Sequence, residues 1–400
     1  MSKSVLFVAI DYPPCRSPGT ERIYKFSKNL QEFGWLSNVL TVNVATHNLD
    51  LLKDDHQDEF NVHRSFCLDT VKYLSYKGKY FSFCAIPDRY ISWVFTALFK
   101  GLWLIKKFKP IIIFSSSPSL TSHIVAGLIA KITKTPWVVD FRDPLQCHYD
   151  DKHYQSFKVH RWIEKKVIAH CSQAIFTTRS AQQMYQRLYP GELSTKFITI
   201  ANGVDLNNFD FSLNKETNRK NFLMLHTGSI YPTGRDPRVL FSALAQLKKK
   251  NLINKSNFLL RFRGAKCGNV YQQMIIENNI ADIIEFKPSI AHKDCLIEMK
   301  AADGLLIIQG KIFFSQIPSK IYEYFITNKK IIAVTPNDSE TARALTQEPG
   351  CYVAESRDDI CQQVLSLINN REKICREVDK FERKHRAGEL SVVFNSIHRL

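Results

Sequence analysis

The stretch Gln316–Val334, QIPSKIYEYFITNKKIIAV, contains a loop, a helix and a strand in direct succession. Pro318 suits the first turn of a helix, because proline lacks an N–H that this turn leaves unbonded and its φ is already helical. The amphipathic helix pattern then runs into the β-branched sequence KIIAV, which predicts a buried strand. The stretch is therefore typical of one helix-to-strand step in a layered α/β protein.

The same alternation extends through the chain. Short β-branched runs such as SVLFVAI, SNVLTVNV, IIIFSSS and WVVDF alternate with helical patterns, and the series restarts after Asn202 with FLMLHTG. This order predicts parallel sheets covered by helices on both faces. The 400 residues also exceed one ordinary core. We expect one domain at 1–205 and a second at 206–379, joined by the polar stretch 202–220, and a basic helix at about 380–400.

Composition limits the classes of partner and compartment. Lys and Arg number 55 against 38 Asp and Glu, a net charge of +17, which favours an anionic partner. The ten cysteines never form C-x-x-C, so neither a zinc site nor a redox pair is indicated, and a reducing cytosol is expected. The N-terminal apolar run is too short for a signal peptide, and no run approaches the roughly 20 apolar residues of a spanning helix.

Ligands of open α/β sheets bind beyond the carboxyl ends of the strands. In the first such loop, at 11–22, Gly19 would let the backbone approach a ligand, and Thr20 is the expected N-cap of the next helix. A rigid strand-to-helix turn is the alternative. No G-x-G-x-x-G is present, so a dinucleotide fingerprint is not supported.

The loops at 115–123 and 138–144 carry serines and charges. The serines are expected to satisfy the donors of a helix start rather than to act in catalysis, and His123 is interpreted as a core or surface histidine. Asp140, Arg142 and Asp143 follow a strand, where burial requires pairing. They form either a structural ion pair or a group that holds a hydroxyl or phosphate.

The loops at 226–240 and 316–323 carry phosphate-compatible cations. Arg235 would grip phosphate oxygens through its planar fork, or it is a solvated loop charge. Lys320 and Glu323 share a helix face and could form a surface ion pair. If that face binds a ligand instead, Lys320 would contact phosphate and Glu323 would accept both hydroxyls of a ribose. That arrangement suits a nucleoside diphosphate.

The order of several motifs resembles the family 4 glycosyltransferases. These motifs are PPCRSPGTER, SSSPSLTSH, VVDFRDP, ITIANGVDLNNF, HTGSIYPTGRDPRVLFSAL, RFRG, IIEFKPSIAHKDCLIEMKAADGLL and IPSKIYEYF. The resemblance implies a GT-B fold, an α/β architecture of two Rossmann-like domains whose parallel sheets face each other across a central cleft. It also implies a last helix, at about 380–400, that returns to pack on the first domain. The activity that it implies is that of a retaining transferase that uses a nucleotide-diphosphate sugar, with no metal, no cofactor and no protein nucleophile.

The resemblance also assigns residues to the two substrates. The first domain would bind the acceptor and the second the donor, with Arg235 on the diphosphate, backbone amides near Lys320 beside the phosphates and Glu323 on the ribose. Two positions depart from the family pattern: Ser315 replaces the first of its two glutamates, and Ser229 replaces its common arginine. The implied donor-binding residues are Gly228, Ser229, Arg235, Arg263, Ile290, Ser315, Pro318, Ser319, Lys320 and Glu323. The implied acceptor-binding residues are Arg16, Gly19, Thr20, Ser117, Arg142 and Asp143.

Residues 64–109 combine nine Lys or Arg and two Asp with twelve aromatic residues, a net charge of +7. The helix pattern around 93–107 and the basic, aromatic loop at 72–80 are typical of contact with an anionic membrane. An ordinary sheet-covering helix is the alternative for its apolar side. Nucleic acid would also suit such a stretch, but no nucleic-acid-binding module is recognisable, so we expect no nucleic acid.

Together these features predict a sugar transferase on the cytoplasmic face of a bacterial membrane, acting on a lipid-linked or polysaccharide acceptor in cell-surface glycan synthesis. Two alternatives are a GT-B protein that binds a sugar nucleotide without transfer, and a sugar-nucleotide epimerase of the same fold.

Overall fold

The computed structural model describes residues 3–15, 19–47, 61–76, 80–145, 154–209, 219–266, 268–370 and 372–398. The chain divides into two compact units. Unit 1 comprises Met1–Asn202 and Arg383–Leu400, and unit 2 comprises Gly203–Glu382. The domain ends expected at 205 and 379 each lie three residues from these boundaries.

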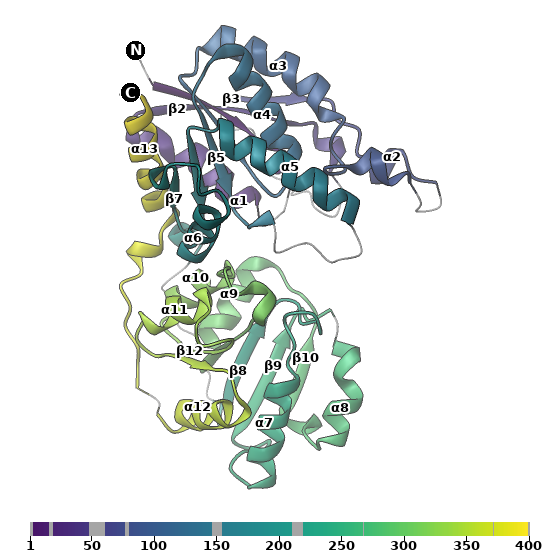
Figure 1. Ribbon diagram of the computed structural model, residues 1–400. Helices are drawn as coiled ribbons and strands as arrows, with labels where there is room; N and C mark the ends of the chain where they lie inside the picture. The colour runs from purple at the N-terminus through teal and green to yellow at the C-terminus, as the bar shows by residue number, and fades with distance from the viewer. Residues whose placement is uncertain are drawn as a thin grey trace. The chain divides into compact units, whose positions relative to one another are not determined.

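Unit 1 contains a sheet of seven parallel strands in the order β3-β2-β1-β4-β5-β6-β7. Figure 1 labels β2, β3, β5 and β7 of this sheet. The chain runs outward from β1 in one direction and then starts again at β4 in the other. Its strands are β1 (Lys3–Val8), β2 (Trp35–Val42), β3 (Asn61–Ser65), β4 (Ile112–Ser116), β5 (Trp137–Phe141), β6 (Gln173–Phe176) and β7 (Phe197–Thr199). Its helices are α1 (Thr20–Asn29), α2 (Thr70–Tyr73), α3 (Trp93–Phe108), α4 (Leu120–Thr133), α5 (Tyr154–His170), α6 (Arg179–Leu188) and α13 (Arg383–His398).

The sheet of unit 1 is buried on both faces, as its continuous apolar strands predict. Leu6 and Val8 of β1 pack into one core layer with residues of α3, α4, α5 and α6. Val5 and Phe7 point the other way, into a layer that contains residues of α1 and α13. The two-residue period of a strand thus divides one apolar run between two cores.

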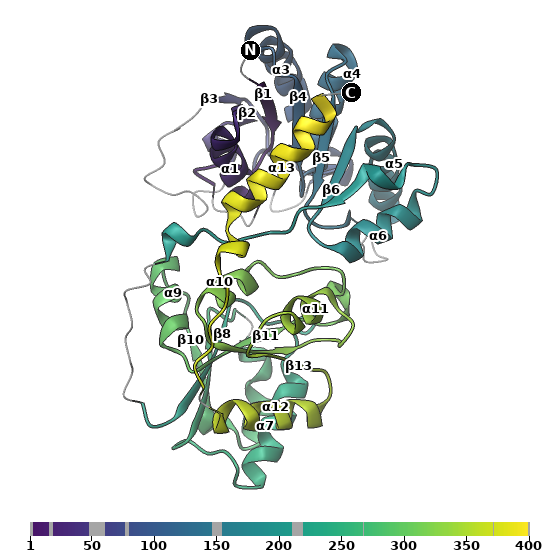
Figure 2. The ribbon, with the colours of Figure 1, turned by 90° about the vertical axis from the view of Figure 1, so that its left-hand side faces the viewer.

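The C-terminal helix α13 belongs to unit 1 and lies beside α1 (Figure 2). Phe394 of α13 contacts the buried Trp35, with ring centroids 5.1 Å apart. Lys3 donates a hydrogen bond of 2.6 Å to the side chain of Asn395. The last helix of the chain therefore completes the core of the first sheet.

Unit 2 contains a second sheet, of six parallel strands in the order β10-β9-β8-β11-β12-β13. Met224 of β8 packs toward α7, α8 and α12, whereas Leu223 and Leu225 pack toward α9, α10 and α11. The strands are β8 (Phe222–Thr227), β9 (Phe258–Arg263), β10 (Ile284–Lys287), β11 (Gly304–Ile308), β12 (Lys330–Val334) and β13 (Cys351–Ala354). The helices are α7 (Arg238–Lys249), α8 (Gln272–Glu277), α9 (His292–Ala301), α10 (Lys320–Ile326), α11 (Glu340–Thr346) and α12 (Arg357–Asn369).

Short 3₁₀ helices occur at Leu30–Phe33, Val44–Thr46, Ser82–Ala85, Ser194–Lys196, Leu206–Asn208, Gly268–Tyr271, Ala281–Ile283, Lys311–Phe313 and Asp379–Phe381. Within the described part of the chain, no helix is both long and apolar enough to cross a membrane.

Candidate functional site

The strand order of unit 2 reverses between β8 and β11, and such a switch point is where open α/β sheets bind ligands. The loops that follow these two strands contact each other, because the Gly310 N–H donates to the Gly234 carbonyl at 2.6 Å. Gly228 and Gly234 have φ of +96° and +117°, which L side chains rarely adopt. A Cβ on Gly234 would lie 2.5 Å from the Ile312 side chain, whereas one on Gly228 would meet open space.

Lys320, the first residue of α10, reaches the end of β8. Its Nζ donates to the Thr227 carbonyl at 2.9 Å and lies 3.4 Å from His226 Nε2. His226 is fully buried, and its Nδ1 lies 2.9 Å from the Leu306 carbonyl, so Nδ1 carries the ring proton and Nε2 presents its lone pair to the lysine. Burial, and secondarily the charge of Arg235, lower the pKa of Lys320 to about 7.

Arg235 provides a second cation at the same strand end. Its guanidinium lies over the rings of Tyr231 and Phe313, at 5.7 and 5.5 Å from their centroids. Backbone hydrogen bonds of 3.0 and 3.1 Å between Tyr231 and Arg235 close the loop that carries it. Among the described residues, no carboxylate forms an ion pair with either Arg235 or Lys320. The two aromatic rings and the closed loop hold a cation whose charge is not neutralised.

Glu323 lies one turn further along α10. Its carboxylate accepts a hydrogen bond of 2.9 Å from His292 Nε2, at the start of α9. The surface ion pair with Lys320, one alternative from the sequence, is therefore not formed. The edge of unit 2 instead presents two cations and, one turn away, a carboxylate that pairs with an exposed histidine.

Arg263 differs from Arg235 because it is held by carboxylate and carbonyl oxygens. Its Nε and Nη2 donate to Glu298 at 2.6 and 2.8 Å, and its Nη1 donates to the Pro288 carbonyl at 2.9 Å. These contacts raise the pKa of Arg263, with the Glu298 hydrogen bonds as the largest cause. A role of Arg263 in donor binding stays a prediction. In that role Arg263 would contact the donor while its guanidinium remains bound to Glu298.

The other implied donor residues lie on loops at the same edge. Ser229 follows Gly228, and Ser315 and Pro318 are half-buried in the loop between β11 and α10. Ser319 is exposed at the start of α10, and Ile290 is 38% exposed in the loop after β10.

Four residues that position this edge were missed from the sequence: His226, Thr227, Gln309 and Tyr324. Gln309 is buried and its Nε2 donates to the carbonyls of Phe313 and Gln316, at 3.1 and 2.9 Å. The Tyr324 hydroxyl accepts from the Thr227 N–H at 3.1 Å. For His226, Thr227 and Gln309 the sequence contains a signal, because polar residues stand at the end of the otherwise apolar runs FLMLHT and GLLIIQ.

In unit 1, Asp140 forms a structural ion pair, but its partner is Arg22 of α1. Asp140 is fully buried and accepts from Arg22 Nη2 at 2.8 Å and from the Ser116 hydroxyl at 2.7 Å. Arg22 also donates to the backbone carbonyls of Ile200 and Ala201, at 2.9 and 3.0 Å. These contacts tie α1, β5 and the segment after β7 together at the carboxyl end of the sheet.

Arg142 and Asp143 pair with each other at 3.0 Å, and the Arg142 N–H donates to the Ser117 hydroxyl at 2.9 Å. Arg142 Nη1 is buried and has no hydrogen-bond partner among the residues that the structure describes. A Cβ on Gly19 would lie 2.5 Å from this nitrogen, so a larger residue at position 19 would require the guanidinium to move. The structure therefore brings together four of the implied acceptor residues: Gly19, Ser117, Arg142 and Asp143.

The two other implied acceptor residues of unit 1 are Arg16 and Thr20. Arg16 lies outside the described residues. The N-cap assignment of Thr20 is wrong: Gly19 is the N-cap, and Thr20 is the buried first residue of α1. Thr20 therefore lies inside the helix, where its side chain is only 2% exposed.

The serine cluster does not cap α4 as expected. Asp88, distant in sequence, accepts from the Thr121 N–H at 2.8 Å and from the Ser119 hydroxyl at 2.7 Å. His123 is fully buried with its Nδ1 2.8 Å from the Ser115 hydroxyl, and burial lowers its pKa to about 4. His123 is thus a core histidine, as interpreted from the sequence.

Two features of unit 1 bear on other ligands. Potential metal ligands of Asp11, Cys15 and His47 lie within 4.8 Å of one another, and the expectation that no metal is needed stays a prediction. A pocket of about 580 Å³ is lined by residues of α13 and by residues around the starts of β6 and β7, such as Cys171, Lys196 and Val393. This pocket is at the amino ends of those strands, away from the edge where α/β sheets bind ligands.

No protein-family model matches this chain, and no curated protein sequence matches it. Solved structures match over nearly the whole length. A sucrose-phosphate synthase from Thermosynechococcus elongatus has a TM-score of 0.68 at 13% identity, covering 99% of this chain and 98% of its own. Alr3699/HepE of Anabaena in complex with UDP has a TM-score of 0.65 at 14% identity, covering 98% and 100%.

The lipopolysaccharide outer core galactosyltransferase WaaB, in its apo form, has a TM-score of 0.64 at 12% identity, covering 98% of this chain and 99% of its own. At such low identities the likeness concerns the fold. Two all-parallel sheets, each covered by helices on both faces, and these matches over almost the full chain show that the protein has the GT-B fold of two Rossmann-like units.

Proposed function

We propose that this protein is a glycosyltransferase whose unit 2 binds a nucleotide-diphosphate sugar. One observation carries the proposal: at the switch point of unit 2, Arg235 and Lys320 lie near each other without a carboxylate partner among the described residues, and Glu323 follows one turn later. A diphosphate would neutralise the two cations. Support for the class of ligand comes from HepE, whose structures contain UDP or UDP-glucose.

Each side chain has a distinct role in the proposed donor complex. The planar fork of Arg235 binds diphosphate oxygens. Lys320 Nζ weakens its hydrogen bond to the Thr227 carbonyl and binds phosphate as a point charge. Gly228 has open space where a Cβ would be, so the backbone there can approach the phosphates. Glu323 releases His292 and accepts the two hydroxyls of the ribose.

Transfer is proposed to proceed with retention of configuration. The bond between the anomeric carbon and the phosphate oxygen breaks, and a bond to the acceptor oxygen forms on the same face of the sugar. The leaving nucleoside diphosphate takes the proton of the acceptor hydroxyl, so no protein nucleophile is required. Unit 1 would bind the acceptor through the edge formed by Gly19, Ser117, Arg142 and Asp143, where the N–H groups of Arg142 Nη1 have no acceptor within the described part of the chain.

The acceptor is proposed to be a lipid-linked or polysaccharide glycan, assembled at the cytoplasmic face of a bacterial membrane for the cell surface. An excess of 17 positive charges favours a substrate or surface that carries phosphate. Because Ser315 is neutral where a glutamate would be expected, the sugar is not proposed to follow the glucose or mannose pattern.

Ligand-induced thermal stabilisation tests the donor assignment, since a ligand that binds only the folded protein raises its melting temperature. A panel of UDP- and GDP-sugars should contain at least one stabilising compound. Arg235→Ala and Glu323→Ala should each reduce that stabilisation and weaken binding while the unliganded melting temperature is retained. Lys255→Ala is the matched control, because this exposed lysine precedes β9 at the opposite edge of the sheet. Unchanged affinity in both site variants would refute the assignment.

Two other functions use the same donor site. A GT-B protein that binds without transfer is favoured by Ser315 and Ser229, which replace charged residues of the family pattern. A sugar-nucleotide epimerase is compatible with the fold, which a putative UDP-N-acetylglucosamine 2-epimerase from Listeria monocytogenes shares at a TM-score of 0.54. Nucleoside diphosphate released only in the presence of acceptor identifies a transferase, whereas an epimerase converts the donor without acceptor.

A further inference from the structure

Helix α3 of unit 1 is apolar on two opposite faces. Trp93, Ala97 and Leu104 are buried against the sheet, which accounts for one face. Phe95 and Phe99 lie on the other side of the helix and are each 74% exposed, and Trp103, one turn further, is 45% exposed. A helix that only covers a sheet has polar residues there. Trp103 also packs edge-on against His63 and Phe108 of unit 1. The exposed rings of Phe95 and Phe99 are thus the part of this stripe that covering the sheet does not explain.

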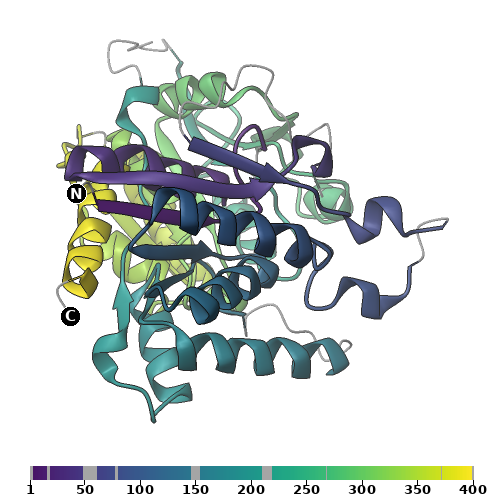
Figure 3. The same ribbon diagram turned by 90° about the horizontal axis from the view of Figure 1, so that it is seen from above.

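A second group of exposed aromatic residues lies just before α3 in the chain. Tyr76, Phe81 and Phe83 are between 70 and 78% exposed, and the rings of Phe81 and Phe83 stack with centroids 5.6 Å apart. Figures 1 and 3 show α2 and the segment that follows it projecting from the body of unit 1. Residues 77–79, which lie in the basic loop singled out from the sequence, are outside the described residues.

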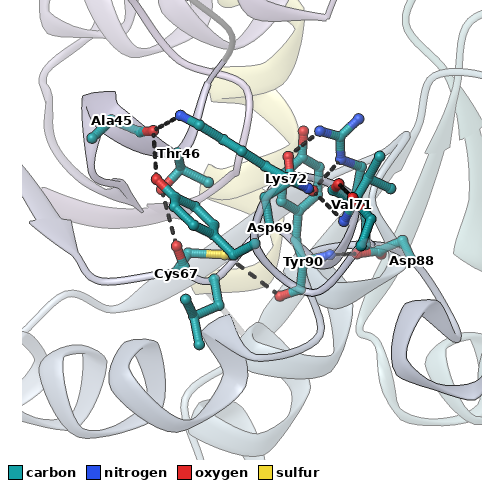
Figure 4. Close-up of polar contacts among 12 residues, drawn as sticks. Ala45, Thr46, Cys67, Asp69, Val71, Lys72, Asp88 and Tyr90 are labelled. Carbon is teal, nitrogen blue, oxygen red and sulfur yellow. Dashed lines mark hydrogen bonds and ion pairs between the residues drawn. The ribbon is translucent and has the colours of Figure 1, made fainter. Parts of the chain in front are cut away.

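Polar contacts fix the base of this projection (Figure 4). Buried Asp69 accepts from the Val71 N–H at 3.0 Å, which caps α2, and it forms an ion pair with Arg89. Lys72 Nζ donates to the Ala45 carbonyl at 2.7 Å. The Thr70 hydroxyl donates to the Cys84 carbonyl at 2.7 Å. The aromatic side chains are thus exposed on an anchored segment.

All charged residues in the sequence around α3 are basic. No Asp or Glu occurs between Asp88 and Asp140. The Nζ atoms of Lys100 and Lys107 each lie 4.7 Å from the centroid of the Trp103 ring. Long basic side chains beside an apolar stripe can bind anionic headgroups while their stems and the aromatic rings contact acyl chains. The basic residues of this stretch are Arg89, Lys100, Lys106, Lys107, Lys109, Lys131 and Lys134.

We propose that unit 1 binds the surface of an anionic phospholipid bilayer through α3 and the projection before it. Phe95, Phe99 and Trp103 enter the interface, Tyr76, Phe81 and Phe83 add a second contact, and the lysines beside Trp103 bind lipid phosphates. The surface is independent of the donor site, since all of its residues lie in unit 1 and the Arg235 and Lys320 edge lies in unit 2. Membrane binding can therefore fail while the proposed function holds, and the reverse.

Vesicle sedimentation with the full chain measures the binding. The protein should bind vesicles that contain about one-third phosphatidylglycerol and bind pure phosphatidylcholine much less, with the difference reduced by salt. The double variant Phe95→Ser and Phe99→Ser should lower partitioning about tenfold or more, because both rings lose their apolar contact. Lys100→Gln with Lys107→Gln should remove most of the preference for anionic lipid.

Matched variants in unit 2 control for apolarity and charge. Val270→Ser with Ile276→Ser changes two residues that are 63% and 65% exposed, and Lys249→Gln with Lys250→Gln removes two exposed charges. Both should leave vesicle binding unchanged. Stabilisation by the sugar nucleotide, measured in parallel, should be retained in all four double variants. Equal loss of binding in the α3 and unit 2 variants would overturn the proposed surface.

Tryptophan fluorescence reports where the protein inserts. The chain has five tryptophans, of which Trp103 and Trp162 are exposed. In a Trp162→Phe protein, brominated anionic lipid should quench Trp103. Absence of quenching with vesicles bound would overturn insertion through α3. Binding to single-stranded RNA without vesicle binding, or dimerisation that Phe95→Ser and Phe99→Ser abolish, would assign the surface to another partner and overturn the proposal.

Discussion

Donor binding should depend on pH through Lys320. Burial and the charge of Arg235 lower the pKa of this lysine to about 7, so in the free protein it is only partly charged at neutral pH. A diphosphate beside Nζ favours the charged form and raises the pKa in the complex. Affinity should therefore be highest where the free lysine is already protonated and should decrease as the pH rises through its pKa.

The magnitude follows from that pKa. With a value of about 7, the free lysine is about nine-tenths protonated near pH 6 and about one-tenth protonated near pH 8. If the bound lysine stays protonated, affinity falls about tenfold over this interval, or about 1.4 kcal/mol. His226 does not contribute, because burial lowers its pKa well below the usual value and keeps the ring neutral. Cys295 does not contribute either, since burial raises its pKa to about 11.

Isothermal titration calorimetry with the most stabilising nucleotide sugar tests this expectation. A nucleotide sugar suits the assay, because its diphosphate is a diester and keeps its charge in this range. Repeating the titration near pH 8 in two buffers of different ionisation enthalpy should show uptake of about 0.9 proton per bound donor. Lys320→Arg, which stays charged, should bind without proton uptake. His292→Gln controls for the histidine that contacts Glu323. Affinity independent of pH, with no proton uptake in the unsubstituted protein, would refute the role of Lys320.

Three further substitutions test the contacts that support the carboxyl end of the unit 1 sheet and the edge of unit 2 that contains Arg235 and Lys320. Arg22→Ala leaves Asp140 buried without its partner and should lower the free energy of unfolding by about 3–5 kcal/mol in urea denaturation; a loss below about 1 kcal/mol would contradict the structural pair. Gly234→Ala should reduce donor affinity about tenfold or more by displacing the loop after β8 that carries Arg235. Gly191→Ala, where a Cβ meets nothing within 4 Å, should leave affinity unchanged. Tyr324→Phe should destabilise the protein by about 1–2 kcal/mol, since a buried N–H loses its acceptor, and an unchanged urea midpoint would argue against that bond.

The layered architecture was accessible from the sequence because it depends on local patterns. Strands buried on both faces read as continuous apolar runs, and the helices between them have their own period, so parallel sheets follow without knowledge of any contact. The loops of interest were also predictable, since parallel strands place their carboxyl ends at one edge. Arg235, Lys320 and Glu323 were singled out in this way, and the structure places them at the switch-point edge of unit 2.

The partners of the charged groups and of the helix N-termini could not be predicted from the sequence, because they come from segments far apart in the chain. Arg22 pairs with Asp140 across 118 positions, although Arg142 is the nearer arginine in sequence. Asp88 supplies the acceptor for the first turn of α4 in place of the local serines. Thr20 is a residue type favoured at N-caps, but α1 begins one residue earlier than expected, so Gly19 is the N-cap and Thr20 is buried in the first turn.

The alternation of strands and helices, their division into two series, and the loops at each sheet edge follow from spacing and apolar periodicity along the chain. Which charges are neutralised depends instead on the folded arrangement of distant segments. Arg263 and Arg235 both follow an apolar strand pattern in the sequence. Arg263 is held by Glu298, whereas Arg235 lies over the rings of Tyr231 and Phe313 and has no carboxylate partner among the described residues. That difference arises because an ion pair depends on distance in space, and it leaves Arg235 and Lys320 to receive an anion.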